Sequence, residues 1–357
     1  MRSIALFLPN WIGDVVMATP AIRAVRAHFR DARLLAVCKP YVADTLAGAP
    51  WFDETILFEK KGPPAQRFAA VAGRLRDAGA DAAVLFPNSF RAALLARVGG
   101  CDTVVGFARY FRDTLLSRRL YPARDRLGRP KPTPVIDDYN RLVEQLGVPD
   151  PGYRMELFTT PADELAADGV WARFGLPRYR EVVGLNPGGA FGAAKHWPTA
   201  AFADLARALV DRRGAGVVVL CGPTEREIAR EIAATAGRPG VVALADVPLS
   251  LGLTKAVVRR LSLLVTTDSG PRHFAGAFDV PVVSLFGPTH IAWTETHFAK
   301  AVHLQKPVPC GPCQQRVCPL GHHRCMTELS AVEVFSAAER LLQTFKDESH
   351  QERRHAG

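Results

Sequence analysis

Two Gly-containing turns in the second half of the chain carry residue types that bind anions. The first turn runs from Asn186 to Pro198 and contains Gly188, Gly189 and Lys195. Its glycines allow backbone N–H groups to approach a phosphate closely, and Lys195 adds a positive charge. The Gly-Lys-Ser/Thr of a Walker A loop is absent, which argues against that class of nucleotide site. A flexible surface loop is the alternative interpretation.

The second turn, Asp268-Ser269-Gly270, follows an apolar, β-branched segment and precedes a segment of small residues. Pro271 suits the first turn of a helix, so a helix is expected to begin there. The unpaired N–H groups of a helix start carry partial positive charge and favour a phosphate. His273 could donate to a phosphate oxygen, or it could pack as a buried polar residue under the turn.

Two carboxylates follow other predicted strands. Asp14 ends the segment that begins at Asn10, and the carboxyl end of a parallel sheet is where a general base would meet a ligand. Asp14 could instead cap backbone N–H groups of its own turn. Glu225 lies in a third strand-to-helix turn and is a candidate partner for a ribose hydroxyl. In that turn Thr224 is expected to be the N-cap, with Glu227 completing a capping box.

Four of the seven cysteines fall in one segment, at Cys310, Cys313, Cys318 and Cys325. The Cys-x2-Cys spacing, with His322 and His323 nearby, is compatible with a structural zinc site. The second pair is spaced more widely than in a zinc knuckle, so packed or free thiols are the favoured interpretation. The other cysteines border apolar strands and are assigned to the core.

The elements that must position these residues alternate strand and helix. In the first half, strands are expected at 3–8, 33–38, 55–58, 82–87 and 102–106, with helices at 20–30, 41–47, 65–78 and 89–98. In the second half, strands are expected at 182–186, 216–221, 241–244, 263–267 and 281–286, with helices at 199–213, 224–236, 249–260, 271–278 and 330–345. This alternation predicts an α/β protein with two Rossmann-like domains facing a central cleft.

The domain boundaries follow from local composition. Pro149-Asp150-Pro151-Gly152 is the strongest linker signal, which predicts domains at 1–150 and 151–330. Residues 331–357 are expected to form a C-terminal helix and a frayed, charged tail from 346. The Arg- and Pro-rich segment 107–137 is expected to be a long irregular loop, and Thr19 is expected to cap the helix at 20–30.

Composition narrows the compartment and the partners. The chain has 357 residues and a formal charge of +10, and no apolar run reaches the ~18 residues of a membrane span. The N-terminal apolar run is short and lacks a cleavage site, so a cytoplasmic location is expected. The basic residues do not interleave with aromatics as in a single-strand groove, and we expect no nucleic-acid partner. The alternative interpretation is that the positive charge comes from ordinary solvated arginines on the surface and indicates no anionic partner.

Together these segments resemble glycosyltransferase family 9, the bacterial heptosyltransferases, and most closely the lipopolysaccharide heptosyltransferase II branch. The matching segments are Pro9–Pro20, Asn186–Pro198, Thr267–His273, Gly287–Thr289 and Cys318–Met326. They occur in order over most of the chain. The family usually has Leu-Met or similar residues where this chain has Pro271-Arg272. This departure from the family pattern could change donor binding, so it bears on the identity of the donor sugar.

The resemblance implies a GT-B fold, with the acceptor on the N-terminal domain, a nucleotide sugar on the C-terminal one, and a last helix that crosses back. It implies inverting transfer of heptose from ADP-heptose to the lipopolysaccharide inner core, without a cofactor or obligate protein partner. Asp14 matches the catalytic base and Lys195 the loop lysine. The residues matching the diphosphate-binding loop are Asp268, Ser269, Gly270 and His273.

The positive charge then suits an anionic acceptor, and the enzyme is expected to lie peripherally on the cytoplasmic face of the inner membrane. The candidates for acceptor or membrane contact are Asn10, Lys60, Lys61 and Arg67. Three alternatives remain open. They are a nucleotide-sugar epimerase or hydrolase of the same fold, a family 9 transferase with another donor sugar, and a non-catalytic nucleotide-sugar binding protein.

Overall fold

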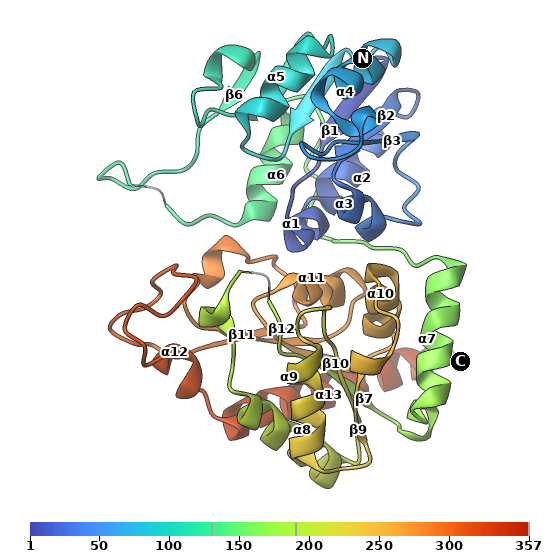
Figure 1. Cartoon of the computed structure of the whole chain (residues 1–357), viewed down its shortest axis with the longest axis vertical. Helices are drawn as coiled ribbons and strands as arrows, with labels where there is room; N and C mark the ends of the chain where they lie inside the picture. Colours follow the sequence, from blue (N-terminus) through green and yellow to red (C-terminus); the bar gives the residue numbers. More distant parts are fainter. Residues whose placement is uncertain (130, 190, 356–357) are drawn as a thin grey trace. The chain divides into compact units, whose positions relative to one another are not determined.

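The computed structural model describes residues 1–129, 131–189 and 191–355 and divides into two compact units (Figure 1). Unit 1 comprises Met1–Phe158 and Ala292–His297, and unit 2 comprises Thr159–Ile291 and Phe298–Gly357. Each unit has its own sheet and is described separately. Among the described residues, no helix combines the length and the apolar character needed to cross a membrane.

Unit 1 is a parallel sheet of six strands in the order β3-β2-β1-β4-β5-β6. The strands are β1 (Ser3–Phe7), β2 (Arg33–Cys38), β3 (Glu54–Leu57), β4 (Ala82–Leu85), β5 (Thr103–Phe107) and β6 (Arg118–Leu120). The helices are α1 (Ile12–Met17), α2 (Thr19–His28), α3 (Pro40–Thr45), α4 (Phe68–Asp77), α5 (Phe90–Val98) and α6 (Val135–Glu144). Strands β1 and β4 are buried along their whole length, as expected for a sheet covered on both faces.

Unit 2 repeats this arrangement with a parallel sheet in the order β12-β11-β10-β7-β8-β9. Its strands are β7 (Val182–Asn186), β8 (Gly216–Val219), β9 (Val241–Ala243), β10 (Leu263–Thr267), β11 (Val282–Phe286) and β12 (Ala301–Gln305). Its helices are α7 (Pro161–Arg173), α8 (Thr199–Arg213), α9 (Arg226–Ala236), α10 (Leu251–Arg259), α11 (Gly270–Ala277), α12 (Arg324–Thr327) and α13 (Ala331–His355).

Both sheets have the same topological switch point. The strand order reverses between β1 and β4 in unit 1 and between β7 and β10 in unit 2. Open α/β sheets bind ligands outside the carboxyl ends of the strands at this point. The turns after β1, β7 and β10 are therefore the places where the fold favours a site.

Several elements differ from the sequence expectations. The segment 107–137 is not wholly irregular, because it contains β6, a short strand with two exposed arginines that gives no apolar run. Helix α2 begins at Thr19 with Ala18 as its N-cap, so the predicted cap is wrong; the Thr19 hydroxyl donates to the Val16 carbonyl at 2.7 Å instead. Helix α13 extends to His355, and residues 356–357 of the expected tail lie outside the described residues.

Helix α13 packs against α8 and β11 within unit 2. The segment Ala292–His297 lies between two parts of unit 2 in the sequence but belongs to unit 1.

Candidate functional site

Asp268, in the turn after β10, is the centre of a buried ion cluster. Its Oδ2 accepts hydrogen bonds from Lys195 Nζ at 2.5 Å and from Thr289 Oγ1 at 2.8 Å. Lys195 Nζ also donates to the Asp268 carbonyl at 3.0 Å, and Arg272 Nη1 lies 3.4 Å from Oδ1. Lys195 is 8% exposed and Asp268 is 5% exposed, so both charges are almost completely removed from water.

These cations keep Asp268 ionised. Burial by itself raises the pKa of Asp268, but the charges of Lys195 and Arg272, with hydrogen bonds from Lys195 and Thr289, outweigh burial and lower it to about 2. Arg272, which departs from the family pattern, is buried, and its guanidinium carbon lies 5.1 Å from the centroid of the Phe286 ring. The extra positive charge of this chain therefore belongs to the internal ion cluster.

The turns after β7 and β10 are joined by hydrogen bonds. The Gly188 carbonyl accepts from Asn186 Nδ2 at 3.2 Å and from Thr267 Oγ1 at 2.8 Å. Asn186 Nδ2 also donates to Ser269 Oγ at 2.9 Å. The structure thus brings Gly188 and Lys195, from the first predicted turn, and Ser269, from the second, to one edge of the unit 2 sheet.

Glu225 lies against the same Gly-rich turn. A Cβ on Gly188 would lie 3.0 Å from Glu225 Cγ, so this close approach favours glycine. A Cβ on Gly189 would meet its nearest neighbour, the Ser269 Cβ, at 3.6 Å, which is ordinary contact. Six predicted donor-site residues therefore share one region, namely Gly188, Gly189, Lys195, Glu225, Asp268 and Ser269.

The predicted cap of helix α9 is wrong. The helix begins at Arg226 with Glu225 in the N-cap position and no side-chain cap. The Glu225 carboxylate accepts from the Gly222 N–H at 2.9 Å, which closes the preceding turn. Glu227 forms an ion pair with Arg230 and does not complete a capping box with Thr224.

His273, on α11, is enclosed by protein. It is 4% exposed, and its Nδ1 has no hydrogen-bond partner among the described residues. Burial lowers the pKa of His273 well below its ordinary value and the charge of Arg272 lowers it further, so the imidazole is neutral at physiological pH. Helix α11 starts at Gly270 without a side-chain cap, and the Ser269 hydroxyl lies 3.1 Å from Thr266 Oγ1 instead.

The Cys-rich segment packs directly on the turn that carries Lys195. The Ala194 N–H donates to the Arg316 carbonyl at 3.0 Å, and His323 Nε2 lies 2.6 Å from the Ala194 carbonyl oxygen. A Cβ on Gly192 would lie 2.4 Å from the Arg316 carbonyl oxygen. The segment therefore braces the turn, a role that sequence spacing did not indicate.

The four clustered cysteines line one small cavity in this segment and are free thiols. Cys310 Sγ lies 3.8 Å from His322 Nε2. Hydrogen bonds from backbone N–H groups, that of His323 first, lower the pKa of the Cys318 thiol, whereas burial raises that of Cys325. Within residues 1–129, 131–189 and 191–355, no three His, Cys, Asp or Glu side chains are grouped so as to hold a metal ion.

Asp14 lies in the first turn of α1, directly after β1, and is half-buried. The Tyr139 hydroxyl forms a hydrogen bond with its carboxylate. Burial and the charge of Asp14 raise the pKa of Tyr139 well above its ordinary value, so the phenol stays protonated and donates. The Tyr139 ring packs edge-on against Phe86, with ring centroids 5.1 Å apart.

Tyr139 is a candidate site residue that sequence reasoning missed, because α6 was not predicted. A signal was present in Ile136, Tyr139 and Val143, which are apolar at helical spacing and are all buried. Two acidic residues in the first turn also mark the start of the helix.

The candidate acceptor residues lie in two loops of unit 1. Lys60, Lys61 and Arg67 are exposed on the loop after β3. Asn10 is exposed in the loop after β1, and its carbonyl accepts a hydrogen bond from Tyr41 Oη at 2.5 Å. Both loops follow carboxyl ends of parallel strands, so they lie at the same edge of the sheet as Asp14, but β2 separates β3 from β1.

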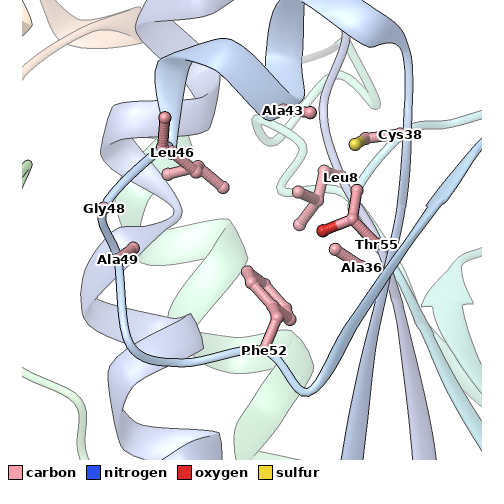
Figure 2. A pocket seen from close by; sticks show the side chains of 10 residues that line it. Leu8, Ala36, Cys38, Ala43, Leu46, Gly48, Ala49, Phe52 and Thr55 are labelled. Atoms are coloured by element: carbon pink, nitrogen blue, oxygen red, sulfur yellow. The ribbon is translucent and has the colours of Figure 1, made fainter. Parts of the chain in front are cut away.

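Unit 1 also contains a cavity of about 210 Å³ beside β2, β3 and the loop after α3. Figure 2 shows Leu8, Ala36 and Phe52 directed toward this cavity. Burial and then the charge of Asp44 raise the pKa of the lining thiol Cys38 to about 12, so the thiol is unreactive at neutral pH. The predicted site residues do not line this cavity.

Known proteins share both the sequence pattern and the fold. The profile of glycosyltransferase family 9 (heptosyltransferase) matches residues 68–324. The lipooligosaccharide heptosyltransferase 2 of Campylobacter jejuni is 26% identical over 353 residues, covering 95% of this chain and 98% of that protein.

Two solved structures have the same architecture. A glycosyl transferase family 9 protein of Veillonella parvula has a TM-score of 0.80 at 23% identity, covering 96% of this chain and 97% of its own. The ADP-heptose lps heptosyltransferase II of Escherichia coli has a TM-score of 0.76 at 24% identity, covering 97% of this chain and 100% of its own.

The two switch-point sheets and these structural likenesses define the GT-B fold that the sequence predicted. The family profile makes the chain a glycosyltransferase. The chain belongs to glycosyltransferase family 9, whose profile covers most of its length.

Proposed function

We propose that the protein transfers a heptose from ADP-heptose to the lipopolysaccharide inner core, with inversion, at the cytoplasmic face of the inner membrane. The observation that carries this proposal is the buried Lys195–Asp268 pair at the switch point of unit 2, in a family 9 chain. The lipooligosaccharide heptosyltransferase 2 of Campylobacter jejuni matches over 98% of its length, which supports the choice of donor and acceptor class.

In this reaction an acceptor hydroxyl attacks the anomeric carbon and the bond from that carbon to the ADP oxygen breaks. Asp14 accepts the hydroxyl proton, and Tyr139 orients its carboxylate through their hydrogen bond. A glycosidic bond forms on the opposite face of the sugar, and ADP leaves with the bonding electron pair. The geometry of unit 1 supports this role because Asp14 follows β1 at the switch point.

The leaving diphosphate is assigned to unit 2. Lys195 and the uncapped start of α11 at Gly270 supply positive charge to it, and His273 Nδ1, which has no hydrogen-bond partner among the described residues, contributes a donor. Gly188 and Gly189 leave room for the nucleotide.

In this assignment the Glu225 carboxylate, at the start of α9, accepts a hydrogen bond from a ribose hydroxyl. Lys195 and the start of α11 take the place of a metal in neutralising the charge of the leaving diphosphate, and we therefore propose no cofactor.

The exposed cations Lys60, Lys61 and Arg67, with Asn10, are assigned to the anionic acceptor. Reversal of all three charges, in a triple variant to Glu, is expected to weaken acceptor affinity while leaving donor affinity unchanged. An unchanged acceptor KM in that variant would remove these residues from the acceptor site.

The experiment that tests the function offers several nucleotide sugars, with and without defined inner-core acceptors, and reads products by mass spectrometry. Addition of one heptose mass to the acceptor, with ADP released only when acceptor is present, is the expected result. Conversion of the donor without acceptor would instead indicate an epimerase or hydrolase, and addition of another sugar would correct the donor. Binding of ADP-heptose without any product would indicate a non-catalytic protein.

A further inference from the structure

Two aromatic side chains of unit 1 are held outside the protein. Tyr110 is 67% exposed and Phe111 is 96% exposed, in the turn after β5. Both have left-handed backbone conformations, with φ of +56° and +59°. Such conformations are uncommon outside glycine, and two in succession need support from the surrounding structure.

Arg112, the next residue, supplies that support. It is completely buried, and its guanidinium donates to the Phe107 carbonyl at 2.8 Å, the Pro87 carbonyl at 2.7 Å and Asn88 Oδ1 at 2.9 Å. Burial, and then the charge of Arg109, lowers the pKa of Arg112 to about 10, so it remains charged at neutral pH. This clamp fixes the base of the turn, and the two aromatic rings project from it.

A second exposed apolar segment leaves the same edge of the sheet. Strands β5 and β6 are parallel, with Phe107 opposite Leu120, and the Ala108 N–H donates to the Leu120 carbonyl at 2.7 Å. After β6, Tyr121 is 63% exposed and Leu127 is 74% exposed. In Figure 1 the chain that follows β6 extends away from the rest of unit 1.

These two segments also carry much of the positive charge of the chain. Residues 108–131 contain eight Arg and Lys against two Asp, a formal excess of six out of the +10 of the whole protein. The exposed cations there are Arg118, Arg119, Arg124, Arg126, Arg129 and Lys131. Exposed aromatic and apolar side chains among arginines match a bilayer interface, where rings sit at headgroup level and guanidinium groups meet lipid phosphates.

We propose that segments 108–112 and 121–129, which we call the aromatic–arginine edge, bind the surface of a bilayer that carries anionic lipids. The inference rests on the proposed function in one respect, because an acceptor anchored in lipid gives the enzyme a reason to stay at the membrane. The edge follows the carboxyl ends of β5 and β6, at the same side of the sheet as the turn that holds Asp14. Binding there would keep unit 1 beside lipid-linked acceptors.

The test uses the full-length protein and sedimentation with vesicles of two parts phosphatidylcholine to one part phosphatidylglycerol. The variant Tyr110→Ser/Phe111→Ser removes the aromatic rings, and Arg124→Ser/Arg126→Ser removes two charges. Each is expected to reduce the fraction bound several-fold, and the parent protein is expected to bind vesicles of phosphatidylcholine alone weakly. Unchanged melting temperatures establish that the variants fold.

Matched controls carry the same kinds of substitution elsewhere. Leu165→Ser/Val332→Ser removes two apolar side chains of unit 2 that are 72% and 68% exposed, and Arg30→Ser/Arg180→Ser removes two exposed charges. Both controls are expected to bind vesicles like the parent. Vesicle binding by the aromatic variant equal to that of the parent would overturn the inference. Loss of binding to a single-stranded oligonucleotide in the edge variants, with vesicle binding intact, would overturn it in favour of nucleic acid.

Activity separates this inference from the proposed function. With a deacylated, water-soluble acceptor, the edge variants are expected to turn over like the parent, whereas with vesicle-borne acceptor their rate falls several-fold. Transfer to both acceptors at parental rates would refute the edge and leave the function intact. Absence of transfer by the parent, with vesicle binding still lost in the variants, would refute the function and leave the edge intact.

Discussion

At the scale of single residues, the site depends on charges that are buried together. Asp268 is held between Lys195 and Arg272, and each of these groups would be costly to bury alone. The ion pair therefore fixes the ammonium of Lys195 at the edge of the sheet before any substrate binds. Such preorganisation is what a site needs to stabilise a leaving group without rearrangement.

Replacement of Asp14 by Asn is the first residue-scale prediction. An amide cannot accept the acceptor proton, so transfer is expected to fall by roughly 10²–10⁴-fold. Asn keeps the size of the side chain, and ADP affinity measured by calorimetry is expected to equal that of the parent. Mass spectrometry of the acceptor product measures the rate, and near-normal turnover would remove Asp14 from the role of base.

Replacement of Asp268 by Asn tests the ion cluster through stability and pH. The pKa of Asp268 is about 2 in the folded protein and near 4 in the unfolded chain. The ionised carboxylate therefore stabilises the folded state fully when the pH is above about 4. This stabilisation is lost as pH falls from about 4 to about 2, and it amounts to about 2 kcal/mol. At neutral pH, Asp268→Asn is expected to destabilise the protein by about 3 kcal/mol or more, because Lys195 and Arg272 lose their carboxylate.

Urea unfolding measures the difference in the free energy of unfolding between the parent and Asp268→Asn. We expect this difference to be smaller at acid pH than at neutral pH. The matched control is Asp279→Asn, which breaks an exposed ion pair with Lys300 in the same unit. That variant is expected to lose less than about 1 kcal/mol. Equal destabilisation by the two substitutions would show that the buried cluster contributes no more to stability than an exposed ion pair does.

At the scale of elements, the Cys-rich segment positions the turn that carries Lys195. Gly192→Ala would place a Cβ 2.4 Å from the Arg316 carbonyl oxygen, at a backbone φ of +152°. The turn must move, and a displacement of about 1 Å in a binding loop is expected to weaken ADP affinity about tenfold or more. Isothermal calorimetry with ADP measures this change.

Gly169→Ala is the matched control for that substitution. Gly169 lies within α7, and a Cβ there meets nothing within 4 Å. This variant is expected to stabilise the helix by about 0.5–1 kcal/mol and to leave ADP affinity unchanged. If Gly192→Ala bound ADP as tightly as Gly169→Ala does, the brace would have no part in donor binding.

Elements with a strong sequence pattern were predictable. Strands such as β1 and β10 are buried runs of mainly apolar and β-branched residues before a turn, and both were predicted to within a residue or two. Strand β6 has three residues, two of them exposed arginines, and its pairing with β5 is a long-range contact that local sequence cannot specify. Helix α6 was hidden because Pro134 and the Arg-rich segment before it indicated a loop.

The site was predictable in part for the same reason. Lys195 and Asp268 each follow an apolar strand that ends in a turn, so their place at a sheet edge follows from the βα alternation. Their direct contact depends on β7 and β10 being neighbours, a pairing of strands 80 or so residues apart in sequence. Tyr139 could not be assigned to Asp14 before α6 was known to pack beside α1.

At the scale of the whole molecule, the chain uses one topology twice. Each unit has six parallel strands in the same order, with its own buried core and its own switch point. Unit 1 presents a carboxylate there, and unit 2 presents a lysine with an uncapped helix. The proposed division between a proton acceptor and a leaving-group site therefore corresponds to the division between the two units.

The last prediction concerns this division. Because each unit has its own core, calorimetric unfolding is expected to show two transitions. ADP at 100 times its Kd is expected to stabilise unit 2 by about 2.7 kcal/mol, since it binds the folded form of that unit, and to shift its transition upward by about 5–10 °C. Core variants assign the transitions, because Leu35→Ala in β2 lowers only that of unit 1 and Val217→Ala in β8 only that of unit 2. An ADP shift confined to the transition that Leu35→Ala lowers would place the nucleotide on the wrong unit and reverse the proposed roles of the two sheets.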